Sequence, residues 1–284
     1  VALVFASRAQ GVDALLPALR DLEDTSHIPI LESPVDLVAE RLEDWLRDAQ
    51  ERIQDGLFIA FVRAPSDAAL ARALVDEARR YCAKRGASKN LFGRLVFVFD
   101  GPSAAAWIAS PEREAVEAQV DVVMWPHKWS RVGLKARLHQ QELRDHDAQV
   151  ERLHEVTGGW GLLVERAFEL SGGHHGRQDA YDRRLEDLAT DATGLAGFLA
   201  AAGLPSGAPG RALLEVLFGL LGSSSEPVAN LSAPLFVDDL PWIDELSLAN
   251  CLVFLVRLGL VEQGESAKGT TIRVDPVAAA SLGP

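Results

Sequence analysis

The sequence predicts an α/β fold: a five-stranded, doubly wound parallel sheet followed by a helical segment and a third unit of helices and a hairpin. Short apolar runs alternate with helical patterns over residues 1–130, and the strand signal then disappears. A stretch rich in proline and glycine at 204–210 reads as a linker, since these residues block helix and sheet. We therefore expect domains at 1–130, 131–204 and 205–284.

The five predicted strands are short and rich in Val, Ile, Leu and Phe, as buried parallel strands are. They are Val1 to Phe5, His27 to Leu31, Leu57 to Val62, Leu95 to Phe99 and Val120 to Met124. The segments between them, 12–22, 35–53 and 66–84, repeat apolar residues at helical spacing. Because parallel strands need crossover connections, this alternation predicts a doubly wound sheet.

The remaining chain is predicted mostly helical. Between Arg131 and Leu204 the expected helices are 131–143, 148–154, 161–170 and 181–202. After the linker come a helix at 211–221, a segment around 235–243, a helix at 247–258 and two strand-like pieces at 260–263 and 270–274. Gly259 stands where a left-handed C-terminal cap is expected. Three helices followed by a hairpin is the order of a winged helix.

Composition disfavours several classes of partner. The 28 basic and 41 acidic side chains give a formal charge of −13, which repels nucleic acid unless a local basic patch overrides it. The apolar runs are far shorter than the roughly 20 residues that a membrane span needs, and no charged and apolar leader opens the chain. The two cysteines, Cys82 and Cys251, lie far apart in sequence, which favours a reducing, cytoplasmic location.

The loop after the first strand carries little of a phosphate-binding pattern. Such a loop reads G-x-x-x-x-G-K-S/T, in which lysine neutralises phosphate and the hydroxyl holds magnesium. Gly11 falls at the second glycine position, but Ala6 replaces the first glycine, Val12 the lysine and Asp13 the hydroxyl residue. A carboxylate there would compete with the anion for the helix dipole. The plain alternative is that Gly11 only turns strand into helix.

Two further strands bear on catalysis. An active ATPase would carry a magnesium-binding carboxylate at the end of the third strand. Arg63 stands near that point, and Asp67 already falls in the next helix. Asp100 ends the fourth strand, either at a sensor position or as the cap of the helix that Pro102 opens. We therefore expect a degenerate nucleotide site with no catalytic residue.

The run Thr157-Gly158-Gly159-Trp160 resembles the T-G-G-x-P motif in the lid of STAND-type ATPases, relatives of the AAA+ family. Gly161 stands where that family usually has proline. The resemblance implies a P-loop-NTPase-like domain at 1–130, a helical lid at 131–204 and a winged-helix domain at 205–284. The plain alternative is a helix start with a tight Gly-Gly turn and a core tryptophan.

The sequence does not indicate a zinc site or a catalytic serine. His174 and His175 lie beside Asp179, and His146 stands between two aspartates, but neither group has the ligand spacing of a zinc site. No G-x-S-x-G elbow is present. We expect no metal site and no cofactor, although ATP or ADP without hydrolysis stays open because backbone groups alone can hold phosphates.

The predicted function is a catalytically inactive, ATPase-like scaffold or regulatory protein. The resemblance implies a multi-component bacterial assembly in signalling, regulation or phage defence, in which the chain binds other subunits or itself.

Two alternatives stay open. The first is a DNA-binding regulator whose third unit contacts DNA through Asn250, Arg257 and Arg273, although 211–284 holds four basic and nine acidic residues, which favours protein contact. The second is the C-terminal part of a longer, active STAND/AAA+ ATPase whose working phosphate loop lies upstream of Val1.

Overall fold

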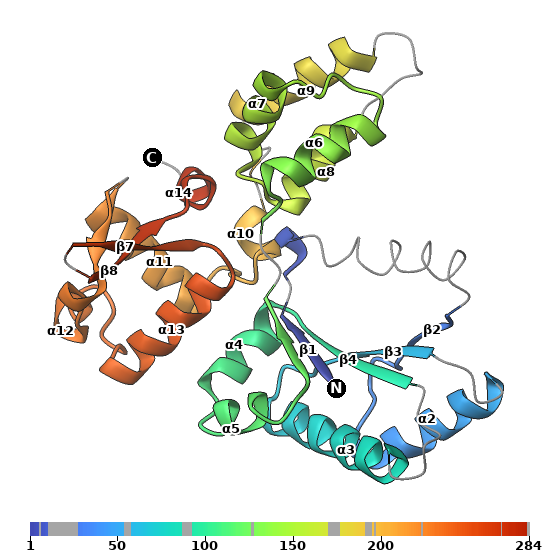
Figure 1. The fold of residues 1–284 in the computed structure, drawn as a ribbon. Helices are drawn as coiled ribbons and strands as arrows, with labels where there is room; N and C mark the ends of the chain where they lie inside the picture. The colour runs from blue at the N-terminus through green and yellow to red at the C-terminus, as the bar shows by residue number, and fades with distance from the viewer. Residues whose placement is uncertain are drawn as a thin grey trace. The chain divides into compact units, whose positions relative to one another are not determined.

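The computed structural model describes residues 1–5, 7–10, 28–53, 58–86, 93–125, 128–169, 177–190, 195, 197–222, 224–267 and 269–282. The chain forms two compact units (Figure 1). The first comprises Val1–Ser7 and Val12–Pro126, and the second comprises Arg8–Gly11 and His127–Pro284. The predicted segments 131–204 and 205–284 both fall in the second unit, and their separation into two domains stays a prediction.

The first unit contains the predicted five-stranded parallel sheet. Its strands are β1 (Ala2–Phe5), β2 (Ile30–Glu32), β3 (Phe58–Arg63), β4 (Gly93–Phe99) and β5 (Val122–Met124). They lie in the order β2-β3-β4-β1-β5, and every pair is parallel. The α/β class is therefore confirmed. β2 begins later than predicted, directly after Pro29, which lacks the N–H that a ladder needs.

Four helices of this unit lie along one face of the sheet (Figure 1). They are α2 (Ala39–Arg52), α3 (Ala68–Gly86), α4 (Gly101–Ala109) and α5 (Arg113–Glu117). The steps from β2 to β3, β3 to β4 and β4 to β5 all run the same way along the sheet, so right-handed crossovers place their helices on the same side. The predicted helix at 12–22 lies outside the described residues.

Aromatic side chains pack against one another at the carboxyl ends of three neighbouring strands. Phe5 of β1 and Phe99 of β4 are register partners whose ring centroids lie 4.5 Å apart. Phe5 also stacks on Trp125 after β5, at 4.0 Å, and Trp107 of α4 lies 4.9 Å from Phe99. Phe5, Phe99 and Trp107 are buried. We call these four residues the aromatic cluster.

The second unit begins with helices α6 (Arg131–Gln140), α7 (Asp147–Thr157), α8 (Gly161–Phe168), α9 (Arg177–Thr190) and α10 (Phe198–Ala201). Leucine, valine and Tyr181 side chains of α6 to α9 form a buried core. The single helix predicted over 181–202 is wrong: α9 ends at Thr190, and α10 begins only after Gly197. Gly197 has a φ of 76°, which a continuous right-handed helix excludes.

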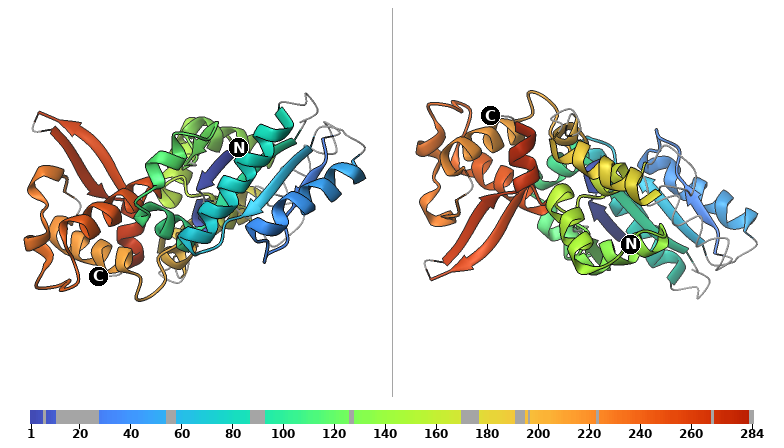
Figure 2. Two further views of the ribbon diagram at one scale, coloured as in Figure 1. Left: turned by 90° about the horizontal axis from the view of Figure 1, so that it is seen from below. Right: turned by 90° about the horizontal axis from the view of Figure 1, so that it is seen from above.

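The C-terminal part of this unit contains α11 (Pro209–Leu221), η2 (Val228–Asn230), α12 (Ala233–Phe236), α13 (Glu245–Arg257) and α14 (Pro276–Leu282). Strands β6 (Glu226–Pro227), β7 (Val261–Ser266) and β8 (Gly269–Val274) form an antiparallel sheet in the order β6-β8-β7. The β7–β8 hairpin is clear in both views of Figure 2. The predicted left-handed cap at Gly259 is confirmed by its φ of 76°.

Among the described residues, no helix is both long and apolar enough to cross a membrane.

We expect Trp107→Ala to lower the free energy of unfolding by about 3 to 5 kcal/mol, because it removes a fully buried ring and leaves a cavity beside Phe99. Urea denaturation followed by circular dichroism measures this change. Leu70→Ala is the matched control, since Leu70 is 54% exposed, and its effect should stay within about 0.5 kcal/mol. Equal effects of the two substitutions would contradict a structural role for the aromatic cluster.

Candidate functional site

The predicted phosphate loop is described only in part. Ala6, Gly11, Val12 and Asp13 lie outside the described residues. Between them, Arg8–Gln10 form a single 3-10 turn, η1, and Ala9 has no exposed surface. This turn belongs to the second unit, where it packs against α8 and α10, and the Gln10 amide donates to the Leu258 carbonyl oxygen at 3.4 Å. This part of the loop is thus held by protein contacts.

The end of β3 carries a cation where an active ATPase would carry a carboxylate. Arg63 is the last residue of β3, and its side chain is exposed. Asp67 lies just before α3 rather than within it, and its carboxylate accepts a hydrogen bond from the Leu70 N–H at 2.9 Å. The nearest following acid therefore stabilises a helix start.

Asp100 caps α4, as one of its two predicted roles required. Its Oδ1 accepts from the Ser103 N–H at 3.2 Å and from the Ser103 hydroxyl at 2.9 Å. Pro102 stands in the first turn of that helix. A contact between Asp100 and a nucleotide stays a prediction.

At the carboxyl ends of β1, β4 and β5, the side chains are mainly aromatic. Ligands of open α/β sheets bind beyond this edge. Here the aromatic cluster covers those three strand ends, with ring stacking between Phe5, Phe99 and Trp125. The faces of these rings supply no ligand for magnesium, and the Trp107 indole N–H already donates to Glu117 Oε1 at 3.1 Å.

The Thr157–Trp160 motif forms a tight turn between α7 and α8. Thr157 is fully buried, and its hydroxyl donates to the Leu153 carbonyl oxygen at 2.7 Å while it accepts from the Gly159 N–H at 3.2 Å. Gly158 and Gly159 have φ values of 58° and 74°, which favour glycine.

Gly159 is also required for space. A Cβ at this position would lie 2.5 Å from the Trp129 carbonyl oxygen. The Trp129 N–H donates to the Gly159 carbonyl oxygen at 2.7 Å, so the turn and residues 128–129 pack directly together.

Asp275 lies at the centre of a cluster that the sequence did not predict. Its side chain is 1% exposed, and Oδ1 accepts from the Trp160 indole N–H at 3.1 Å. The same oxygen caps α14 through the N–H groups of Val277 and Ala278, at 3.0 and 2.9 Å. Its other oxygen pairs with Lys128 Nζ at 2.5 Å. A buried carboxylate needs such partners, because an unpaired one is strongly destabilising.

Lys128 extends this cluster to the hairpin. Its ammonium group also pairs with Glu262 of β7 at 3.0 Å and lies 5.3 Å from the centre of the Trp160 ring. Glu262 pairs in turn with Arg273 of β8. We call Lys128, Trp160, Glu262, Arg273 and Asp275 the Asp275 junction. Its two cations and two anions balance, which leaves no net charge to attract a phosphate.

Charge contacts shift the pKa values of the exposed pair in this junction. Partial burial of Glu262 opposes its ionisation, but hydrogen bonds from Arg273 and Lys128 outweigh burial and hold the pKa of Glu262 below its ordinary value. The hydrogen bond to Glu262 raises the pKa of Arg273. Both side chains are therefore charged at neutral pH.

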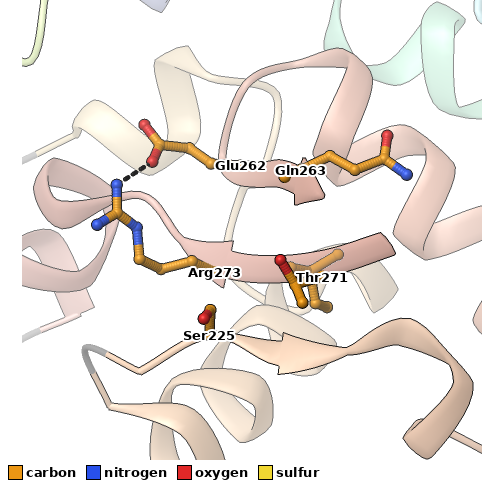
Figure 3. Close-up of a pocket in the computed structure, with 7 residues that line it drawn as sticks. Ser225, Glu262, Gln263, Thr271 and Arg273 are labelled. Carbon is orange, nitrogen blue, oxygen red and sulfur yellow. Dashed lines mark hydrogen bonds and ion pairs between the residues drawn. The ribbon is translucent and has the colours of Figure 1, made fainter. Parts of the chain in front are cut away.

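An open hollow lies on the sheet beside this pair (Figure 3). It is lined by Ser225, Glu262, Gln263, Gly264, Thr271, Ile272 and Arg273. Figure 3 shows Arg273 of β8 reaching Glu262 of β7, so the hollow presents a paired cation together with hydroxyl and amide groups. Within the described ranges, no group of three His, Cys, Asp or Glu side chains could hold a metal ion.

The three residues predicted as possible DNA contacts lie on two elements of the second unit. Asn250 and Arg257 lie on α13, both partly buried, and Arg273 lies on β8 with its guanidinium group on Glu262. Contact with DNA stays a prediction for all three.

One role of Asp275 could have been predicted from the neighbouring sequence, and the other could not. Asp275 is followed by Pro276, a recognisable start of a helix, so its capping role could have been predicted. Its pairing with Lys128 crosses 147 residues, and no spacing rule covers that separation.

The chain thus consists of an α/β unit with a parallel sheet in the order β2-β3-β4-β1-β5 and a mainly helical unit, whose β7–β8 hairpin is followed by the C-terminal helix α14. No protein-family model matches the chain, and no curated protein matches it.

Three solved structures are similar to the chain over 99% of its length. The ORC2 protein of Aeropyrum pernix, in ADPNP–ADP complexes, has a TM-score of 0.49 at 12% identity, with 85% of that chain covered. A threonine-to-valine variant of Thermotoga maritima RuvB has a TM-score of 0.45 at 13% identity, with 86% covered. Cdc6p from Pyrobaculum aerophilum has a TM-score of 0.35 at 12% identity, with 85% covered.

We expect Asp275→Ala to lower the free energy of unfolding of the second unit by about 3 kcal/mol, because it leaves Trp160 and the α14 amides without their acceptor. Urea denaturation followed by tryptophan fluorescence measures the loss. Glu155→Ala removes an exposed carboxylate of α7 and should change stability by less than about 0.5 kcal/mol. A loss below about 1 kcal/mol for Asp275→Ala would show that the junction is dispensable.

The lowered pKa of Glu262 predicts a pH dependence of stability. Glu262 binds a proton less tightly in the folded chain than in the unfolded chain. The stabilisation that its ionised form contributes is therefore complete above the ordinary glutamate pKa of about 4.3, and it is lost as pH falls through the lowered pKa. Denaturation at a series of acidic pH values should therefore show a shallower loss for Glu262→Gln than for the unchanged chain. Glu155→Gln, the control, should keep the original slope. Parallel slopes for all three would rule out this linkage.

Proposed function

We propose that this protein is a catalytically inactive ATPase-like module of the STAND/AAA+ kind, which serves as a scaffold or regulatory protein. The end of β3 carries this proposal. Arg63 occupies the position where magnesium would need a carboxylate, and Asp67 is engaged at the start of α3. Without that carboxylate, magnesium-assisted phosphoryl transfer has no protein ligand at this strand.

The loop sequence supports the same conclusion independently. In the sequence pattern, Val12 stands in place of the lysine that neutralises phosphate, and Asp13 stands in place of the residue whose hydroxyl holds magnesium. Two unrelated positions thus lack the groups that hydrolysis requires. Binding of ATP or ADP without hydrolysis is compatible with both, since backbone N–H groups alone can contact phosphates.

The Asp275 junction supports a structural role for the Thr157–Trp160 motif of the proposed lid. The indole of Trp160 donates to Asp275, so the turn after α7 is fixed to the C-terminal segment of the same unit. The order of α11, α12 and α13 followed by the β7–β8 hairpin supports a winged-helix domain there. In this proposal the lid and the winged helix form one stable body that presents surfaces to other subunits of a bacterial assembly, or to a second copy.

A hydrolysis assay tests the proposal. The purified chain with ATP and magnesium should release phosphate at the rate of the buffer alone. Release well above background that is abolished by Gly11→Ala or Asp100→Asn, but kept by the exposed-surface control Asp48→Asn, would contradict it. Calorimetric titration with ATP and with ADP separately measures whether nucleotide is held without turnover.

A further inference from the structure

The segment 235–246, which joins α12 to α13, exposes four large apolar side chains. They are Leu235, Val237, Trp242 and Leu246, with exposed fractions of 49%, 47%, 43% and 71%. Their neighbours Phe236, Leu240 and Ile243 are buried. The segment is therefore anchored to the core by one set of side chains while it presents another set to solvent. We call the four exposed side chains the 235–246 surface.

Backbone and capping contacts hold this surface in place. The Ala233 N–H donates to Glu245 Oε1 at 3.0 Å, which joins the starts of α12 and α13. The Leu240 N–H donates to the Phe236 carbonyl oxygen at 2.7 Å, and Asp244 caps α13 through the Ser247 N–H at 2.7 Å. Figures 1 and 2 place α12 at the edge of the second unit away from α6–α9. Those helices therefore do not cover the surface.

The charged side chains of the segment itself are all acidic. Asp238, Asp239, Asp244 and Glu245 are all exposed. Between Arg211 and Arg257 the chain contains no lysine, arginine or histidine. The negative charge thus has no cation beside it in sequence, and it repels nucleic acid and anionic lipid while it attracts a cationic partner.

We propose that the 235–246 surface binds a basic amphipathic helix of a partner protein. Such a helix would lay its apolar face on Trp242 and Leu246 and bring lysine or arginine side chains to the surrounding carboxylates. Trp242 is the expected anchor, since tryptophan contributes strongly at protein interfaces. The inference rests on the protein-binding role proposed above and gives that role a place and a partner chemistry.

Fluorescence anisotropy with a labelled Leu/Lys amphipathic helical peptide tests it on the full chain. Trp242→Ser and Leu246→Ser should each weaken binding at least about tenfold. Asp238→Asn combined with Asp239→Asn should weaken binding at low salt and flatten its salt dependence. Leu70→Ser and Asp48→Asn, exposed positions of the first unit, should leave affinity unchanged. Circular dichroism verifies that each variant is folded.

Several outcomes would overturn the inference: no peptide binding, equal binding of a matched Leu/Glu peptide, or unchanged affinity in folded Trp242→Ser and Leu246→Ser. Binding to phosphatidylcholine vesicles that requires Trp242, without peptide binding, would assign the surface to a membrane. Self-association lost in Leu246→Ser, again without peptide binding, would assign it to a second copy.

The experiments distinguish failure of the proposed function from failure of the proposed binding surface. ATP hydrolysis together with Trp242-dependent peptide binding would contradict the proposed function alone. Absence of both hydrolysis and peptide binding would contradict this surface alone.

Discussion

The second unit depends on the buried carboxylate of Asp275. This group receives an ammonium group, an indole N–H and two backbone N–H groups, and these come from three separate parts of the chain. A charge with almost no exposure cannot stay unpaired, so each donor is held where the carboxylate requires it. The turn after α7, the start of α14 and residue 128 are consequently fixed to one another.

The same interaction gives the Thr157–Trp160 motif a structural role in this protein. Gly159 is needed because Trp129 lies directly against it, and Trp160 is needed because its indole serves Asp275. Both requirements are structural. In the described residues, the Thr157–Trp160 motif thus contributes packing contacts and a hydrogen bond within the second unit.

Local features of this fold were predictable, and distant ones were not. The parallel strands follow from apolar runs, and the cap at Asp100 follows from a carboxylate placed just before Pro102. The start of β2 was missed because Pro29 was counted as strand, and the break before α10 was missed because the left-handed conformation of Gly197 was not foreseen. The pairs around Asp275 depend on tertiary packing, which brings Lys128 to a residue 147 positions away.

Lys128 and Asp275 lie 147 positions apart in sequence, yet their charged atoms are 2.5 Å apart. Their ion pair therefore closes a long loop of the chain. Bringing two such distant residues together costs conformational entropy, which the packing of the second unit has to offset.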